Sequence, residues 1–262
     1  MTYIIAVANA KGGVAKTTTA LSVSASLSEL DNKVLMIDLD PHANLSLYSG
    51  IKPNEIEHSI ADVFLGSETI ESVKVSTPMN KVDIAPSNHE LSLAESHLIV
   101  RENYEHILKN SLEVVDDYDL VILDCPPTLG TLTRNALTAA DMLIIPTQPE
   151  YFSTNALRDM LYLIRNIRQR SNPNLRYRVV VTMLDRRNRV HKDLAHHIRT
   201  AFGQALFDVT IEVDTRLRES AVIGQPITTY APQSRSAGQY RELALELRQY
   251  TNGFARKYPQ PS

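Results

Sequence analysis

Short runs of Val, Ile and Leu alternate along the chain with longer stretches in which apolar residues recur at helical spacing. The apolar runs predict six buried strands, at residues 3–9, 33–40, 81–87, 118–127, 141–149 and 177–185. The helical spacing predicts helices at residues 17–30, 95–115, 154–170 and 191–202. Nearly continuous apolar strands separated by helices indicate an α/β fold, with a mostly parallel twisted β-sheet flanked by helices on both faces.

The composition agrees with a single globular unit. A chain of 262 residues can bury a large core, and no repeat, low-complexity block or clear linker divides it, so we expect one domain over residues 1–262. The single cysteine, Cys125, excludes a disulfide framework or a several-cysteine metal site within one chain. No apolar stretch approaches the roughly 20 residues that span a bilayer, and no leader pattern opens the chain. We expect a cytoplasmic protein.

Charge is unevenly distributed along the sequence. The net charge is −3, but residues 176–262 hold 14 Lys and Arg against 8 Asp and Glu, a net of +6 against −9 for the remainder. Such asymmetry suggests a localised basic surface. An ordinary set of solvated helix faces is the alternative reading.

The stretch VANAKGGVAKTTTAL, residues 7–21, holds two lysines five residues apart, Lys11 and Lys16. It lies between a predicted strand and a predicted helix, where a phosphate-binding loop would stand. Backbone N–H groups and the helix N-terminus would hold a phosphate, Lys16 would neutralise its charge, and the Thr17 hydroxyl would bind Mg²⁺. Because alanine occupies both glycine positions of the general loop, a Gly-Gly turn with two solvated lysines stays open as the alternative.

The second lysine favours a particular family. KGGVAKTT resembles the deviant Walker A motif, K-G-G-x-x-K-[TS], of the ParA/MinD family of ATPases. Four further segments match that family in order and spacing: VLMIDLDPHANLS (34–46), YDLVILDCPPTLGTLTRNAL (118–137), LIIPTQPEYFSTNAL (143–157) and VVVTMLDRRNRVHKDL (179–194). The late segment TRLRESAVIGQPITTYAPQSRSAGQYRELALEL (215–247) resembles the Soj-like partition branch. The resemblance covers nearly the whole chain and implies a P-loop NTPase type of fold.

The resemblance implies an ATP-bound sandwich homodimer, in which Lys11 crosses the interface to the partner's phosphates and adds charge stabilisation to catalysis. The resemblance also implies that Lys16 is a catalytic residue of the loop. The implied ATP-binding residues are Lys11, Gly12, Gly13, Val14, Ala15, Lys16, Thr17 and Thr18, with Thr182 and Asp185 as the remaining base-side candidates.

Carboxylates complete the implied chemistry. Asp40 matches the family residue that positions or activates the attacking water, and Asp124 matches the Walker B aspartate that holds Mg²⁺. Thr17 and Asp38 complete the predicted magnesium set. Asp38 would support the metal indirectly, through groups that contact it, because Asp38 points the same way as Asp40 on a strand. The alternative for each aspartate is a strand-end carboxylate that faces solvent.

Two departures from the family pattern matter. Ala15 stands where relatives usually carry glycine; a left-handed backbone there would cost alanine roughly 1–2 kcal/mol, whereas a right-handed one would cost nothing. Glu212 and Val213 replace a Pro-Arg pair that is typical near the base in partition members. The contacts to adenine therefore stay open.

The partition branch binds DNA without sequence preference when it is dimeric, so the resemblance implies a nucleoid-associated protein. Phosphate contacts require only cations summed over two subunits. The candidates are Arg187, Arg189, Arg216, Arg218 and Arg235, in the basic part of the chain. For each arginine taken singly, a structural salt bridge is the alternative, for example between Arg218 and Glu219.

The resulting expectation is a slow ATP hydrolase that positions or segregates a plasmid, chromosome or protein cargo, stimulated by a ParB-like or other cargo adaptor. A MinD-like ATPase on a membrane is the alternative; it requires a C-terminal amphipathic basic helix, which residues 248–262, with one glycine and two prolines, do not favour. A scaffold or metal-delivery relative is a third reading, against which the lone cysteine argues.

Overall fold

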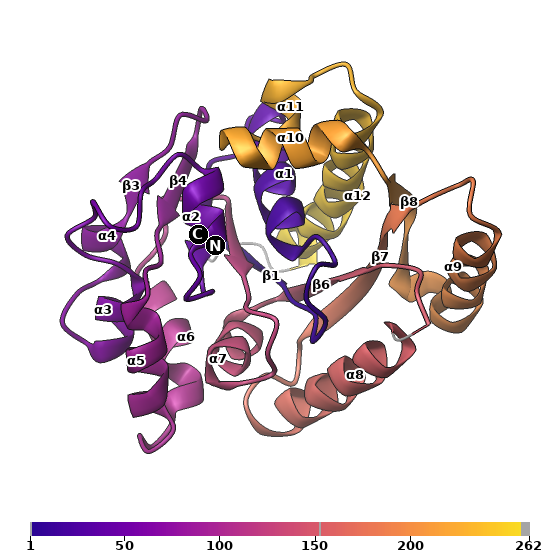
Figure 1. The fold of residues 1–262 in the computed structure, drawn as a ribbon. Coiled ribbons are helices and arrows are strands. Elements are labelled where there is room, and N and C mark those ends of the chain that lie inside the picture. Colours follow the sequence, from indigo (N-terminus) through magenta and orange to yellow (C-terminus); the bar gives the residue numbers. More distant parts are fainter. Residues whose placement is uncertain (1, 152, 258–262) are drawn as a thin grey trace.

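The computed structural model describes residues 2–151 and 153–257 (Figure 1). Its eight strands form one sheet in the order β3-β4-β2-β5-β1-β6-β7-β8, and only the short β3 runs antiparallel to its neighbour. The predicted α/β class with a mostly parallel sheet is confirmed. The strands are β1 (Tyr3–Val7), β2 (Val34–Asp38), β3 (Val75–Ser76), β4 (Val82–Ala85), β5 (Leu120–Asp124), β6 (Met142–Thr147), β7 (Arg176–Leu184) and β8 (Leu206–Glu212).

The six predicted strands are all present, and β3 and β8 are additional. β8 lies at the edge of the sheet, where Phe207, Val209 and Ile211 are buried and Asp208 is exposed. An edge strand of this kind alternates apolar and polar residues, so it lacks the continuous apolar run that identifies the central strands.

The helices are α1 (Lys16–Glu29), α2 (Asn44–Tyr48), α3 (Ile60–Leu65), α4 (Ile70–Val73), α5 (Glu90–Leu98), α6 (Ile107–Leu112), α7 (Thr131–Ala139), α8 (Ser153–Arg170), α9 (Arg189–Phe202), α10 (Thr215–Ile223), α11 (Ile227–Tyr230) and α12 (Arg235–Lys257). The expectation of one helix over residues 95–115 is wrong. Asn103 takes a left-handed conformation with φ 56°, which a right-handed helix cannot contain, and the chain divides there into α5, a 3₁₀ turn at Tyr104–His106 and α6.

Two hydrophobic layers cover the two faces of the sheet. Ile5 and Val7 of β1 face α1 and α12, whereas Ala6 between them packs with residues of α3, α5, α7 and α8. In Figure 1, α1 and α10–α12 lie above the sheet and α5–α8 below it. Burial on both faces is the reason that the central strands are continuous apolar runs.

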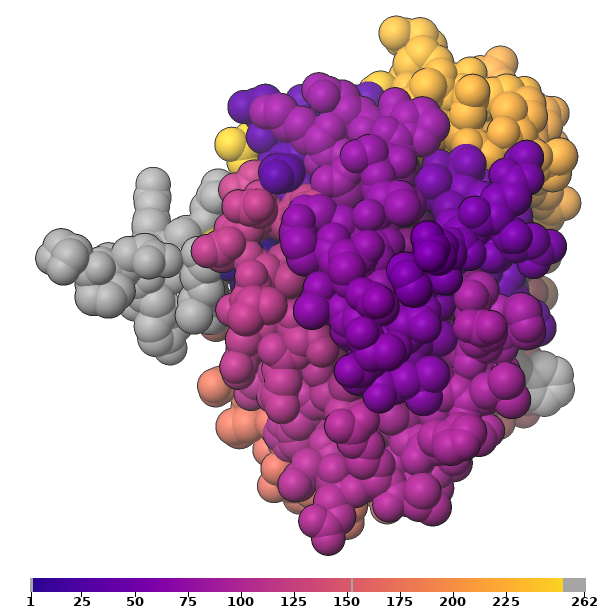
Figure 2. Space-filling model, turned by 90° about the vertical axis from the view of Figure 1, so that its left-hand side faces the viewer, coloured from indigo at the N-terminus to yellow at the C-terminus, as the bar shows by residue number. Residues whose placement is uncertain are grey.

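The strand order brings three connections to one edge. β5 lies between β2 and β1, and Asp124 at its end is the register partner of Asp38 on β2 and of Val7 on β1. The loops that follow these parallel strands therefore meet at their carboxyl ends, where α/β sheets bind ligands. Figure 2 views the molecule from the β3 side, where the violet segments of α3, α4 and α5 form the surface.

The last element that the structure describes is the 23-residue helix α12, which includes residues 248–257 of the segment discussed above as a candidate membrane-binding helix. Part of the segment that we expected not to form a membrane-binding helix, residues 258–262, lies outside the described residues. Among the helices that the structure describes, none is both long and apolar enough to cross a membrane.

Candidate functional site

The loop between β1 and α1 is anchored on both sides. The Asn9 side-chain amide donates to the Pro146 carbonyl at 2.7 Å, and its oxygen accepts from the Lys11 N–H at 3.0 Å. On the other side, the buried Thr182 hydroxyl donates to the Val14 carbonyl at 3.0 Å. These hydrogen bonds hold the loop in its observed shape.

Two residues of this loop are left-handed. Gly13 has φ +72°, and Ala15, which precedes α1, has φ 67° and ψ 36°. Of the two alternatives for Ala15, the structure shows the strained one. No described side chain caps the first turn of α1, and no acidic residue lies in that turn. Its N–H groups therefore remain available to an anion, which the helix dipole also favours.

The two lysines of the loop have different surroundings. Lys16 is buried, and its Nζ donates to the Lys11 carbonyl at 3.1 Å. Burial lowers the pKa of Lys16, and the nearby Asp124 opposes that shift. The Lys11 ammonium instead forms an ion pair with the carboxylate of Glu150, and both side chains are partly exposed. Glu150 follows β6, so only the fold reveals that it lies beside Lys11.

Asp124 is fully buried beside this loop. Burial, and then the neighbouring Asp38, raise the pKa of its carboxyl well above the usual range. The Thr17 hydroxyl lies near enough to lower that pKa, but no hydrogen bond of normal geometry reaches either carboxylate oxygen from the described residues. A buried carboxylate without a partner is costly. A hard divalent cation such as Mg²⁺ takes such oxygens as ligands, so the position fits a metal.

Asp38 is also buried, but its two oxygens are occupied. One accepts from the Asp40 N–H at 3.1 Å, and the other from the N–H and hydroxyl of Ser46 at 2.9 and 2.8 Å. Burial raises the pKa of Asp38 to about 6, against the effect of these hydrogen bonds. This arrangement suits a carboxylate that positions the groups around a metal without contacting the metal itself. Ser46 was not expected from the sequence, because its backbone contacts form only once α2 folds over β2.

Asp40 lies in the turn that follows β2. The residue is 7% exposed, and its carboxylate accepts from the His42 N–H at 3.0 Å. Like Asp124, this carboxylate opposes the lowering of the Lys16 pKa that burial causes. Asp40 and Lys16, which are distant in sequence, therefore face the same space at the end of the sheet.

A cavity of about 310 Å³ adjoins the loop on the side of β7, β8 and α10. The loop contributes Gly13 and Ala15 to it, and α1 contributes Thr18. The other residues around it include Tyr48, Met183, Ile211, Glu212, Val213, Asp214, Leu217 and Tyr240. The base of a nucleotide whose phosphates lie at the loop could extend into this cavity.

The two base-side candidates do not line this cavity. The Thr182 hydroxyl donates its hydrogen bond to the Val14 carbonyl, and Asp185 lines a second cavity of about 450 Å³. There the Arg187 guanidinium bonds Asp185 from Nε and Nη2 at 3.1 Å each and lowers its pKa to about 2. Tyr240 was missed: it comes from α12, and its hydroxyl lies 3.3 Å from the Thr19 hydroxyl on α1.

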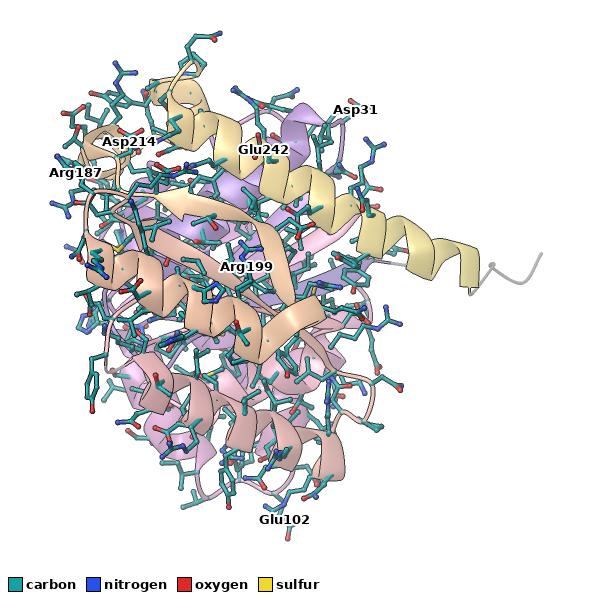
Figure 3. The ribbon with its side chains drawn as sticks, turned by 90° about the vertical axis from the view of Figure 1, so that its right-hand side faces the viewer. Asp31, Glu102, Arg187, Arg199, Asp214 and Glu242 are labelled. Carbon is teal, nitrogen blue, oxygen red and sulfur yellow. The ribbon has the colours of Figure 1, made fainter. Side chains whose placement is uncertain are left out.

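The candidate arginines divide into two groups. Arg187, Arg189 and Arg235 each have a carboxylate partner, Asp185, Asp193 and Glu212 respectively. Arg216 and Arg218 are exposed on α10, and no carboxylate in the described part of the chain forms an ion pair with them. Glu219 accepts instead from the Tyr230 hydroxyl at 3.1 Å, so the alternative of a salt bridge between Glu219 and Arg218 is wrong. Figure 3 shows Arg187 near Asp214, at the end of the face that carries α9 and α12.

Known proteins resemble the chain over most of its length. A family model described as an AAA domain matches residues 2–177. The sporulation initiation inhibitor protein Soj of Bacillus subtilis is 35% identical over 249 residues, 94% of this chain and 98% of that protein. The chromosome partitioning protein ParA of Myxococcus xanthus is 35% identical over 246 residues, 93% of this chain and 87% of that protein.

A solved structure shares the fold at a similar level of identity. The Mycobacterium smegmatis protein named cobyrinic acid a,c-diamide synthase, with bound ATP analogue and magnesium, superposes with a TM-score of 0.83 at 34% identity, covering 100% of each chain. The match spans the loop, the aspartates and α12 alike. The chain therefore belongs to the ParA/MinD family of P-loop ATPases.

Proposed function

We propose that this chain hydrolyses ATP with Mg²⁺ at the loop of residues 11–18 and uses the cycle to position or segregate cargo on DNA. The observation that carries the proposal is the unpartnered, fully buried Asp124 carboxylate beside the uncapped N-terminus of α1. Anion-binding N–H groups and a cation-binding carboxylate next to each other suit a magnesium–polyphosphate. Relatives that carry an ATP analogue and magnesium support it.

Each residue of the site then has a role in phosphoryl transfer. Lys16 binds phosphate oxygens, and Thr17 and Asp124 hold Mg²⁺. Asp38 does not contact the metal but orients Asp40 through the Asp40 N–H. Magnesium, when bound, neutralises the charge that develops on the transferred group. Asp40 orients the attacking water through its carboxylate. The loop N–H groups and Thr18 bind the remaining phosphates, and the base extends into the cavity beside Met183.

Lys11 has the special role in the proposed dimer. Its ammonium is partly exposed and pairs with Glu150, so it can exchange this partner for an anion on a second subunit. Two polyphosphates that face each other repel, and a cation supplied by each subunit offsets that repulsion. ATP then holds the homodimer together, and hydrolysis loosens it.

The dimer is proposed to bind DNA without sequence preference, through exposed cations such as Arg216 and Arg218 on α10. These two arginines have no described carboxylate partner, so they keep their charge available for phosphate. A ParB-like or other adaptor would stimulate hydrolysis and couple it to a plasmid, chromosome or protein cargo. The protein would act in the cytoplasm on the nucleoid. Relatives named chromosome partitioning protein ParA support this assignment.

The proposal is tested by combining two substitutions. Asp40→Ala should retain ATP and accumulate the dimer, because the water is no longer oriented while the ATP contacts remain. Asp40→Ala/Lys11→Ala should bind ATP as a monomer, because the charge that joins the subunits is lost. Analytical ultracentrifugation with ATP and Mg²⁺ measures the difference.

Lys52→Ala, in the same Asp40→Ala background, is the matched control, because Lys52 is an exposed lysine that pairs with Glu55 away from the loop. It should leave the dimer intact. A dimer that persists in the Lys11 variant would contradict the role of Lys11. DNA binding is measured separately: Arg216→Ala should weaken it and lower the salt slope by about one phosphate contact per subunit, whereas Arg165→Ala on α8 should not.

A further inference from the structure

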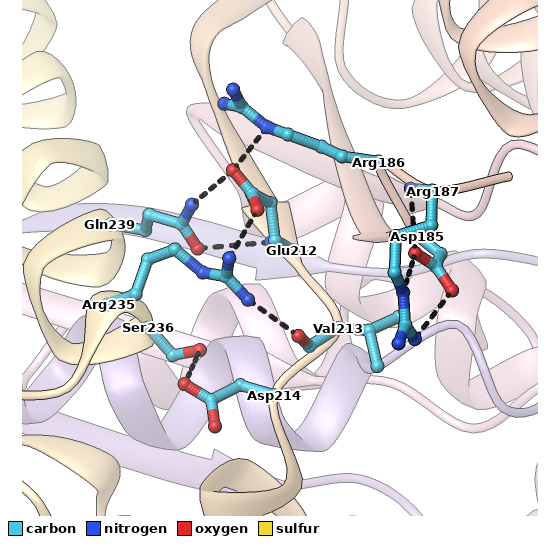
Figure 4. A network of polar contacts seen from close by, with 9 residues as sticks. All are labelled: Asp185, Arg186, Arg187, Glu212, Val213, Asp214, Arg235, Ser236 and Gln239. Atoms are coloured by element: carbon cyan, nitrogen blue, oxygen red, sulfur yellow. Dashed lines mark hydrogen bonds and ion pairs between the residues drawn. The ribbon is translucent and has the colours of Figure 1, made fainter.

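Glu212, the last residue of β8, is the centre of a network of polar contacts (Figure 4). Its Oε1 pairs with Arg186 Nε at 2.7 Å, and its Oε2 pairs with Arg235 Nη1 at 2.8 Å. Gln239 also donates to Oε1, at 3.3 Å, and accepts from the Glu212 N–H at 3.0 Å. One carboxylate therefore joins the β7–α9 connection to the start of α12.

The members of this network differ sharply in burial. The side chain of Glu212 is 5% exposed, whereas those of Arg186 and Arg235 are 71% and 56% exposed. An arginine that leaves Glu212 stays in a mostly solvated position, whereas the Glu212 carboxylate remains buried. The arginine side chains are therefore already largely solvated, and an external anion can compete with Glu212 for the guanidinium groups, while the Gln239 amide remains as a hydrogen-bond donor to the carboxylate.

The arginines stand at a cavity whose charges balance. The cavity of about 450 Å³ is lined by Arg186, Arg187 and Arg235 and by the carboxylates Asp185, Glu212 and Asp214. Three positive charges against three negative ones give no net attraction for phosphate. If Glu212 no longer holds Arg186 and Arg235, two guanidinium groups become available to an anion on the same face of the molecule.

The same segment of chain borders both cavities. Glu212, Val213 and Asp214 line the cavity beside the phosphate loop and the arginine-lined cavity alike. Arg235 also donates from Nη2 to the Val213 carbonyl at 2.8 Å. A nucleotide that fills the first cavity therefore touches the residues that hold Arg235 in the second.

We propose that Glu212 is a lock on DNA binding: in the nucleotide-free chain it retains Arg186 and Arg235, and it yields them to DNA phosphates when the adjoining cavity is filled. This inference rests on the DNA binding proposed above. It assigns the arginine-lined cavity as a phosphate-binding position, and Glu212 as a positioning residue that acts through the two arginines.

The test is the DNA affinity of Glu212→Gln without nucleotide, with ADP and with ATP, measured by fluorescence anisotropy of a labelled mixed-sequence duplex over a salt series. The logarithm of DNA affinity falls with the logarithm of salt concentration by about 0.9 per phosphate contact. Each gained contact therefore adds about eightfold to the rise in affinity between 1 M and 0.1 M salt. We expect the nucleotide-free variant to bind DNA about eightfold or more tighter than the wild type at 0.1 M salt, with a steeper slope. The ratio between its ATP and nucleotide-free affinities should shrink.

Matched controls separate the lock from the change in net charge. Asp208→Asn removes one charge from an exposed position on the same strand without touching an arginine, and it should have little effect. Adding Arg235→Gln to Glu212→Gln should remove most of the gain. If Asp208→Asn gives the same gain, the lock is refuted. Glu212→Asp, which keeps the buried charge but shortens the side chain, should give a smaller gain and serves if Glu212→Gln does not fold.

The outcomes distinguish this inference from the proposed function. If the wild type binds DNA with ATP and Glu212→Gln behaves identically in every nucleotide state, the lock is wrong and the proposed function stands. If neither protein binds DNA in any nucleotide state, the DNA-binding function falls and the lock falls with it.

Discussion

Replacing Ala15 with glycine relieves a strain that the structure locates at one backbone position. The left-handed conformation of Ala15, with φ 67° and ψ 36°, costs an alanine about 1–2 kcal/mol. Glycine adopts it freely but loses more conformational entropy on folding, about 0.5–1 kcal/mol. The balance favours Ala15→Gly by roughly 0–1.5 kcal/mol of unfolding free energy. At about 2–4 °C per kcal/mol for a domain of this size, Tm should rise by up to ~6 °C.

The effect on nucleotide affinity has a ceiling set by the same strain. Asn9 and Thr182 hold the loop from both sides, so their hydrogen bonds favour the left-handed conformation of Ala15 in the folded chain. Strain at Ala15 lowers nucleotide affinity only by reducing the fraction of molecules in which the loop has this conformation. Ala15→Gly should therefore tighten binding of a non-hydrolysable ATP analogue, or speed turnover, by no more than about tenfold for ~1.4 kcal/mol.

Thermal unfolding, calorimetric titration with the analogue and steady-state hydrolysis measure these quantities on one preparation. Gly13→Ala is the reciprocal control: it places a methyl at φ +72° in the same loop, where no atom lies within 4 Å, so its cost is confined to the backbone. It should lower Tm while Ala15→Gly raises it. A lower Tm together with weaker binding for Ala15→Gly would refute the reasoning, because relief of strain cannot produce both.

Three further substitutions test the site. Lys16→Ala should abolish tight ATP binding in calorimetry, because phosphate charge is left uncompensated; binding within about tenfold of the wild type would exclude its role. Asp40→Ala should retain ATP but lose hydrolysis in a phosphate-release assay, and unchanged turnover would remove Asp40 from the mechanism. Asp124→Asn should abolish the additional shift in Tm that Mg²⁺ produces with ATP, because a carboxylate ligand of the metal is replaced by a neutral amide; an undiminished shift would place the metal elsewhere.

The elements that could be predicted from sequence are those with a local signal. The central strands, buried on both faces, are continuous apolar runs, whereas β8 alternates because it is an edge strand. The break at Asn103 could not be read from apolar spacing, since a single left-handed residue leaves the hydrophobic pattern on both sides intact.

The candidate site divides in the same way. The loop of residues 11–18 and Asp124 carry local motifs, so they were accessible to sequence reasoning. Glu150 and Tyr240 were not, because each lies far along the chain from the group that it contacts and only the strand order and helix packing bring them together. The pairing of Arg235 with Glu212 was inaccessible for the same reason.

The position of β1 in the middle of the sheet has a consequence for synthesis of the chain. Tyr3 is the register partner of Leu120, so β1 has no neighbour in the sheet until 117 more residues have been added. At translation rates of about 5–20 residues per second, β1 waits for roughly 6–23 s. The proposed nucleotide cavity is complete later still, because Tyr240 on α12, which lines it, is made 120 residues after Leu120. A nascent chain therefore forms the central sheet before this cavity is complete, so ATP bound there would stabilise only chains in which α12 has already packed.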